Sequence, residues 1–268
     1  MRFGYCLGLD FLQEDAGQKS LFGMVAEVGF DYVELPLSGL WALPESELPR
    51  LEKSLTSIPC RACNLFFPPS LSIVGENMDI SGIRAYLARM LPLVASLGVE
   101  TLVFGNGGAR KIPEGTMRES IWDNLRTLVE IMDEYADKHG VTICVEPLNS
   151  TETNILTSYG EAAKLTNGLN NVATMIDSYH VAMEAQAFDD VLEAPEKLKH
   201  LHTAYPEGRF VPSPQDSMVM YAEFVKVVKQ LGYSGKISIE GRLRTTAPTD
   251  MYNEVAAALH TLINLFAV

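Results

Sequence analysis

Residues 138–149 read KHGVTICVEPLN, and this stretch carries the pattern that decides the fold. A helical segment ends at Gly140, and glycine takes the left-handed conformation after a helix without a Cβ clash. The β-branched, apolar run that follows predicts a buried strand, because such runs are typical of parallel sheets covered on both faces. Glu146 comes directly after the run, so a carboxylate is expected where the strand ends.

Short runs of this kind alternate with helical segments along the whole chain. The eight runs are FGYCLGL (3–9), YVELPL (32–37), CRACNLFF (60–67), TLVFGN (101–106), TICVEPLN (142–149), VATMID (172–177), LKHLHTA (198–204) and KISIEG (236–241). Amphipathic stretches lie between them, including 82–97, 118–139, 159–169 and 220–231. Eight strand–helix units predict one domain, a single (β/α)8 TIM barrel over residues 1–268. An open, doubly wound sheet is the alternative, but no G-x-G-x-x-G phosphate loop follows the first run.

The composition favours a cytoplasmic barrel. The chain has 268 residues, close to the roughly 250 of a TIM barrel, and 47% of them are hydrophobic. The N-terminal segment MRFGYCLGLDFLQED has one basic residue and no long apolar run, which argues against a signal peptide or a membrane span. The four cysteines lie inside apolar runs, so no disulfide framework is expected.

The charge balance argues against nucleic acid as a partner. The net charge is −13, with 34 acidic against 21 basic residues, and no cluster of Lys and Arg occurs in the sequence. Proteins that bind phosphate backbones need a basic surface to release counterions.

Polar side chains stand at the ends of seven of the predicted strands: Glu34, Asn64, Asn106, Glu146, Asp177, His202 and Glu240. Catalytic groups of barrel enzymes project from these strand ends. The last four follow buried runs, where carboxylates are costly unless they are paired or bound to a metal. They predict an oxygen and nitrogen site for one divalent metal ion, Mn²⁺ first, with Mg²⁺, Co²⁺ or Zn²⁺ as alternatives. The competing interpretation is that each polar residue only caps its loop.

Four segments resemble the sugar isomerase/epimerase branch of the xylose-isomerase-like TIM-barrel superfamily, which includes the ketose 3-epimerases. EPLNSTETN (146–154) is similar to the family segment E-P-L-N-x-x-E-T-N, and IDSYH (176–180) to its D-x-x-H element. HLHTA (200–204) resembles the H-x-H-T segment, and GYSGKISIEG (232–241) the closing G-Y-x-G-x-x-x-x-E. The four segments occur in the family order.

The resemblance implies a role for each matching residue. The family's metal ligands correspond to Glu146, Asp177, His202 and Glu240, and its two glutamates also act as an acid/base pair on opposite faces of the sugar. Substrate contacts correspond to Glu152, His180 and Arg209. Arg209 lies seven residues after His202, where those epimerases usually have six, and the loop YPEGRFVPSPQD (205–216) lacks their P-G-x-G element. The first departure leaves the role of Arg209 open, and the second leaves the identity of the sugar open.

The remaining polar residues near the strand ends are expected to contact the sugar or to support the site. Asn64 and Asn106 are expected to hydrogen-bond sugar hydroxyls. His180 either contacts substrate or orients a ligand carboxylate. Glu34 is interpreted equally as a structural acid or a substrate contact, and His200 is expected deeper in the barrel, hydrogen-bonded in the core.

The predicted function is metal-dependent epimerisation of a free ketose through an enediolate, with Glu146 and Glu240 transferring protons. A hydro-lyase acting on a cyclic polyol such as an inosose is the main alternative. A carbonyl-shifting isomerase and a non-catalytic sugar-binding barrel are also left open, as is a homo-oligomer. DNA-repair endonucleases of the superfamily need extra histidines on the second to fourth strands, where this chain has Glu34, Asn64 and Asn106.

Overall fold

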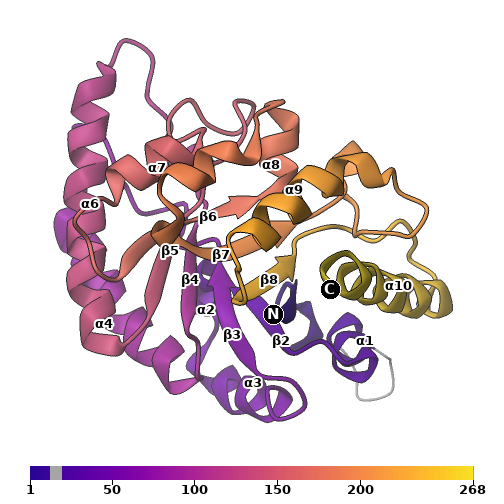
Figure 1. The fold of residues 1–268 in the computed structure, drawn as a ribbon. Coiled ribbons are helices and arrows are strands. Elements are labelled where there is room, and N and C mark those ends of the chain that lie inside the picture. Colours follow the sequence, from indigo (N-terminus) through magenta and orange to yellow (C-terminus); the bar gives the residue numbers. More distant parts are fainter. Residues whose placement is uncertain (13–19, 268) are drawn as a thin grey trace.

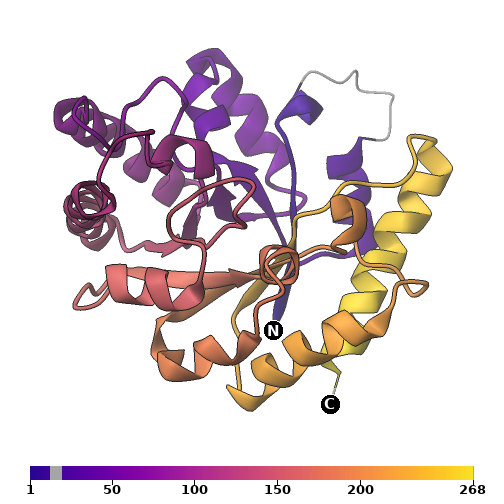
Figure 2. The ribbon, with the colours of Figure 1, turned by 90° about the horizontal axis from the view of Figure 1, so that it is seen from above.

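A computed structural model describes residues 1–12 and 20–267. Eight parallel strands pair in chain order and close into a barrel, which confirms the predicted (β/α)8 TIM barrel. The strands occupy the centre, with helices around them (Figures 1 and 2). They are β1 (Arg2–Cys6), β2 (Tyr32–Pro36), β3 (Cys60–Asn64), β4 (Thr101–Phe104), β5 (Thr142–Val145), β6 (Val172–Asp177), β7 (Leu198–Thr203) and β8 (Lys236–Ile239).

The helices form the outer ring, and α1 and α10 lie side by side (Figure 1). The α-helices are α1 (Leu21–Val28), α2 (Leu37–Ala42), α3 (Leu48–Ser54), α4 (Ile80–Ser96), α5 (Gly107–Arg110), α6 (Arg118–His139), α7 (Tyr159–Leu165), α8 (Ser178–Met183), α9 (Met218–Gln230) and α10 (Pro248–Phe266). Short 3₁₀ helices are η1 (Asp10–Leu12), η2 (Glu45–Glu47), η3 (Phe188–Glu193), η4 (Pro195–Lys197) and η5 (Glu207–Arg209).

Local sequence signals set several helix ends. Ser20 and Asp79 cap the starts of α1 and α4, because their side chains accept hydrogen bonds from Gly23 N and Gly82 N. Gly140 caps the end of α6 with a φ of 65°, in the left-handed region, as predicted from the sequence.

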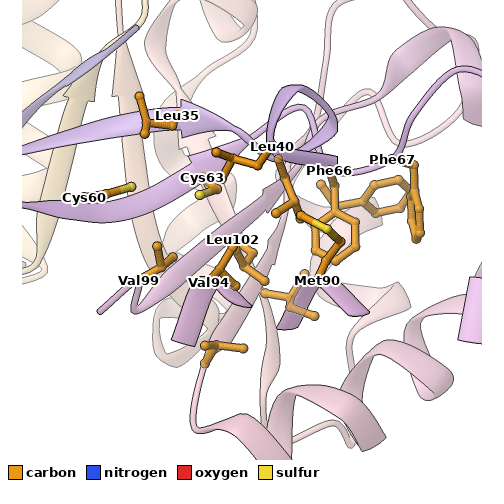
Figure 3. Packing of buried hydrophobic residues seen from close by; sticks show 14 of the residues in the cluster. Leu35, Leu40, Cys60, Cys63, Phe66, Phe67, Met90, Val94, Val99 and Leu102 are labelled. Carbon is orange, nitrogen blue, oxygen red and sulfur yellow. The ribbon is translucent and has the colours of Figure 1, made fainter. Parts of the chain in front are cut away.

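The main core lies between the barrel and the helices. Leu35, Cys63 and Leu102, on three adjacent strands, belong to the same fully buried cluster as Met90 and Val94 of α4 (Figure 3). Burying each side chain of this size contributes about 1.5–3 kcal/mol. The four cysteines are free thiols, and Cys60, Cys63 and Cys144 are buried.

The interior of the barrel is filled by a second, smaller set of side chains. Val103, Cys144 and Met175 form a separate, fully buried apolar cluster. Cys144 and Met175 lie two positions before Glu146 and Asp177, so they point to the same face of the strand, one layer deeper.

On β7 and β8 the corresponding deeper positions are polar, with His200 before His202 and Ser238 before Glu240. Both His200 and Ser238 are fully buried. This deeper layer of the interior is therefore apolar on β4, β5 and β6 and polar on β7 and β8.

In the part of the chain that the structure describes, every helix is too short or too polar to cross a lipid bilayer.

Candidate active site

Four side chains from successive strands converge at the carboxyl end of the barrel. Glu146 and Glu240 directly follow β5 and β8, while Asp177 and His202 lie on β6 and β7. Each residue has one atom that could bind a metal ion, and these four atoms all lie within 4.8 Å of one another. His202 Nδ1 is 3.1 Å from Glu240 Oε2 and 3.4 Å from Glu146 Oε1. The structure therefore brings together the four residues that the sequence predicts as metal ligands.

The chemistry of this cluster fits a divalent metal ion. Glu146, Asp177 and His202 are almost fully buried, and among the described residues no donor is in hydrogen-bonding position to Glu146 Oε1. A buried carboxylate oxygen without a partner is costly unless a cation binds it. Three carboxylates and one imidazole make an oxygen-rich ligand set of the kind that Mn²⁺ and Mg²⁺ take.

The pKa values of the carboxyl groups reflect their mutual repulsion and their cationic neighbours. Burial raises the pKa of Asp177 to about 6, against the attraction of Arg209. Burial also raises the pKa of Glu146, and the charge of Glu240 adds to this effect. Burial acts on Glu240 in the same direction, but His202 and Arg209 outweigh it and lower that pKa to about 2.

A second group of atoms that could bind a metal, from Cys6, Glu34 and His202, lies next to the four-residue cluster and shares His202 with it. It suits a metal less well, because both oxygens of Glu34 already accept hydrogen bonds. His202 Nε2 lies 2.9 Å from Oε1, while His200 Nε2 and Ser238 Oγ lie 3.0 and 2.6 Å from Oε2. This geometry places His200 deeper in the core, as predicted, and makes Glu34 a partner of the site histidine.

Arg209 reaches over the cluster from the loop after β7. Its Nη2 atom donates to Glu240 Oε2 at 2.7 Å and to Asp177 Oδ2 at 3.3 Å, and Nη1 lies 3.6 Å from Glu152 Oε1. The guanidinium also lies 4.5 Å from the centre of the Tyr179 ring. Arg209 has a φ of 49°, in the left-handed region that is costly for residues other than glycine. Strain of this kind is typical of functional sites.

Asn149 is a buried residue that hydrogen-bonds both His180 and Glu152, and this role was not expected from the sequence. Asn149 Nδ2 lies 2.8 Å from His180 Nδ1 and donates to Glu152 Oε1 at 3.2 Å. Asn149 N also donates to His180 Nδ1, so this ring nitrogen is an acceptor and the proton of neutral His180 is on Nε2. Burial lowers the pKa of His180, which favours that neutral form. Nε2 lies 3.6 Å from Asp177 Oδ2.

The two asparagines predicted to bind sugar hydroxyls have partners within the protein. Asn64 donates from Nδ2 to Glu240 Oε1 at 3.0 Å. Asn106 accepts from Phe67 N and donates to Phe67 O, both at 2.9 Å. Its amide therefore ties the loop after β3 to the end of β4, and a sugar contact by Asn106 stays a prediction.

Two further residues near Glu146 were missed from the sequence. A Cβ on Gly105 would overlap Glu146 Oε2, so this position leaves room for the carboxylate. Arg110 is fully buried, donates from Nη1 to Phe104 O at 3.0 Å and also donates from Nη2 to the backbone oxygen of Glu146. Burial lowers its pKa to about 10, and Glu146 opposes that change. The segment FGNGGARKIPEG (104–115) contains both residues and is the signal that could have found them.

A cavity of about 700 Å³ adjoins the cluster, and of the four cluster residues Glu240 lines it. It is lined by residues of several strand-end loops, including Asn64, Leu65, Tyr179, Met183, Arg209 and Glu240. Its volume lies within the roughly 300–1,000 Å³ of pockets that bind small molecules.

Fold and site together define a (β/α)8-barrel protein with a candidate metal centre at its strand ends. The chain belongs to the family described as Xylose isomerase-like TIM barrel, whose profile matches residues 22–262. This match confirms the family-level resemblance that the sequence segments indicate.

The curated relatives are epimerases. The chain is 25% identical to a D-psicose 3-epimerase of Agrobacterium fabrum, over 82% of this chain and 78% of the relative. It is 24% identical to a 3-dehydro-D-guloside 4-epimerase of Escherichia coli, over 94% and 96%. A crystal structure of a D-psicose 3-epimerase in the presence of D-fructose matches all of both chains, with a TM-score of 0.80 at 20% identity. This structural match supports the fold.

Proposed function

We propose that this protein is a divalent-metal-dependent sugar epimerase that inverts the carbon next to the carbonyl group of a ketose. The observation that carries the proposal is the position of two glutamates, from two separate strands, next to one imidazole nitrogen. Glu146 and Glu240 both lie within 3.4 Å of His202 Nδ1 and come from β5 and β8. The curated relatives, all epimerases, support assignment to the isomerase class of enzymes.

Glu146, Asp177, His202 and Glu240 would hold the metal, with Mn²⁺ the first candidate. When bound, a divalent cation supplies Lewis-acid stabilisation of negative charge on the sugar oxygens. The protein's own groups move the proton. One glutamate removes it from one face of the carbon and the other returns a proton to the opposite face, which inverts the centre.

The other residues near the cluster would orient the sugar. Arg209 and the Nε2–H group of His180 direct hydrogen-bond donors towards the cluster. The carboxylate of Glu152, beside Arg209, is a hydrogen-bond acceptor. Asn64 would position Glu240 through its hydrogen bond to Oε1. A hydroxyl-rich substrate needs such a mixture of donors and acceptors, because each buried polar group left unpaired costs free energy.

The test combines metal analysis with a substrate panel. After dialysis against Mn²⁺, elemental analysis should find about one ion per chain, because there is one four-ligand cluster of this kind in the described residues. The loaded protein is then incubated with free ketoses, aldoses and an inosose, and products are separated by chromatography. An epimeric ketose supports the proposal. A folded protein that binds no ion, or one that only dehydrates the inosose, contradicts it.

A further inference from the structure

Glu34 is a fully buried carboxylate to which the proposed proton transfer gives no role. It lies directly beneath the four-residue cluster and is bonded on both oxygens. Oε1 lies 2.9 Å from His202 Nε2, and Oε2 lies 3.0 Å from His200 Nε2 and 2.6 Å from Ser238 Oγ. Two strands, β7 and β8, thus direct three donors at one acid on β2.

The donor and acceptor in each of these bonds can be assigned. An ionised carboxylate only accepts hydrogen bonds, so the single proton of the Ser238 hydroxyl points to Glu34. The Tyr32 hydroxyl lies 2.8 Å from Ser238 Oγ and must then be the donor in that contact. The hydrogen bonds therefore run in one direction, from Tyr32 through Ser238 to Glu34, and meet those from the two histidines.

This direction determines which nitrogen of His202 is available above. A metal binds the neutral form of the ring, and because Nε2 donates its proton to Glu34, the lone pair of that form is on Nδ1. Nδ1 is the atom that faces Glu240 Oε2 at 3.1 Å and Glu146 Oε1 at 3.4 Å. We propose that Glu34 is a positioning residue that holds His202 in the Nε2–H tautomer and so presents Nδ1 to the metal. This inference rests on the proposed function.

His200 completes the arrangement by fixing the second oxygen of Glu34. It is fully buried, and among the described residues its Nδ1 has no hydrogen-bond partner, so its polar contact is with Glu34. Gly4 on β1 makes room for the ring of Tyr32, because a Cβ at that position would overlap the ring. Five buried positions on four strands therefore support the carboxylate of Glu34: Gly4, Tyr32, His200, His202 and Ser238.

A purely structural role does not account for this polar network. On β4, β5 and β6 the same interior layer is filled by Val103, Cys144 and Met175, so apolar side chains are able to fill this layer. Replacing a buried ionic network by apolar groups is often neutral or stabilising. The network lies under His202 but not under Glu146 and Asp177. This position indicates that the network orients the imidazole ring of His202. Carboxylate partners of this type orient ligand histidines and typically contribute 10–100-fold in metal affinity.

The experiment measures Mn²⁺ affinity and the proton position on His202. Free Mn²⁺ is titrated by electron paramagnetic resonance against the wild type and the variants Glu34→Gln, Ser238→Ala and Tyr5→Phe. Glu34→Gln should raise the Mn²⁺ Kd by 10–100-fold. Ser238→Ala, which keeps Glu34, should raise it less. Tyr5→Phe is the control, because its buried hydroxyl has no partner among the described residues, and it should bind like the wild type.

A second readout uses ¹⁵N NMR of the Zn²⁺-loaded wild type, whose sequence has five histidines. His202 should carry its proton on Nε2 and bind the ion through Nδ1. A proton on Nδ1, or a folded Glu34→Gln variant with unchanged Mn²⁺ affinity, overturns the inference and leaves the proposed function standing. A lower melting temperature with unchanged affinity would mean that Glu34 is only structural. A folded wild type that binds neither ion overturns both proposals.

Discussion

At the scale of single residues, Glu146 and Glu240 carry the proposed chemistry. Each is a candidate metal ligand and proton carrier, and glutamine keeps the shape of the side chain but cannot act as a general acid or base. We expect Glu146→Gln and Glu240→Gln each to lower kcat by at least about 10²-fold, the usual contribution of a general acid or base. Steady-state rates on the substrate found in the panel measure this loss.

The matched control is Glu130→Gln, which removes a carboxylate from a surface ion pair with Arg126 on α6. It should keep wild-type rates. Activity near that of the wild type in either site variant would show that the acid/base assignment is wrong.

Gly105 is expected to be as sensitive as the acids it borders. A Cβ there would overlap Glu146 Oε2, so Gly105→Ala must displace the carboxylate. A misplacement of about 1 Å at a reacting group costs about 10²-fold in rate. Gly108→Ala, three residues further on, meets no atom within 4 Å of the added Cβ and should leave the rate unchanged. Equal kcat values in the two variants would contradict the proposed role of Gly105.

A functional residue is easier to predict from the sequence when its position along a strand marks it than when only its side-chain contacts do. Glu146, Asp177, His202 and Glu240 could be found because each ends a strand, and all parallel strands end on the same side of the barrel. The contact of Asn149 with His180 and that of Glu34 with His202 could not be found in this way. They depend on side-chain rotamers, and the two partners are separated by 31 residues in the first contact and by 168 in the second. Asn106 shows the same limit, because its contact with Phe67 connects two different loops.

At the scale of elements, Glu100 joins the beginnings of several strands at the opposite end of the barrel. It accepts from Arg2 on β1 at 2.7 Å and from Lys236 on β8 at 2.8 Å, and lies 3.8 Å from Arg61 on β3. The hydrogen bond from Arg2, together with Lys236, outweighs partial burial and lowers the pKa of Glu100 to about 2. The carboxylate thus links strands that are far apart in the sequence.

We expect Glu100→Gln to lower the free energy of unfolding at pH 7 by about 1 kcal/mol, since the side chain is 41% exposed and solvent screens the pairs. A folded-state pKa below the unfolded value gives stability that is present above about pH 4.5 and is lost as the pH falls towards 2. The difference between variant and wild type should therefore shrink at pH 3. Urea unfolding at both pH values measures it, and a difference that grows on acidification would contradict the assignment.

Element boundaries were predicted less well than the elements themselves. The predicted helix at 118–139 coincides with α6 (Arg118–His139), because periodicity and a closing glycine both mark it. The run at 142–149 is longer than β5, which ends at Val145, because EPLN (146–149) leaves the strand to form the site. The short helices α2, α5 and α8 were not predicted, since one or two turns give little periodicity.

At the scale of the whole molecule, the closed barrel decides from which directions a bound sugar is approached. Strands β5 and β8 are separated by β6 and β7 around the barrel, so Glu146 and Glu240 extend over the site from different sides. No local sequence feature contains this relation. It follows only from eight strands pairing in order and closing, and it is the reason that two separate proton carriers are proposed.

Two carriers on two faces predict that the reaction exchanges a carbon-bound proton with solvent. The proton that one glutamate removes is not the proton that the other returns, and the carboxyl group of Glu240, which lines the open cavity, is expected to exchange its proton with water quickly. In D₂O the epimeric product should therefore carry deuterium at the inverted carbon, which mass spectrometry and ¹H NMR detect. A hydride shift between adjacent carbons would leave the product unlabelled, because the hydrogen never leaves the substrate. Unlabelled product from an active enzyme would refute two-base epimerisation, and loss of water from the substrate would favour a hydro-lyase.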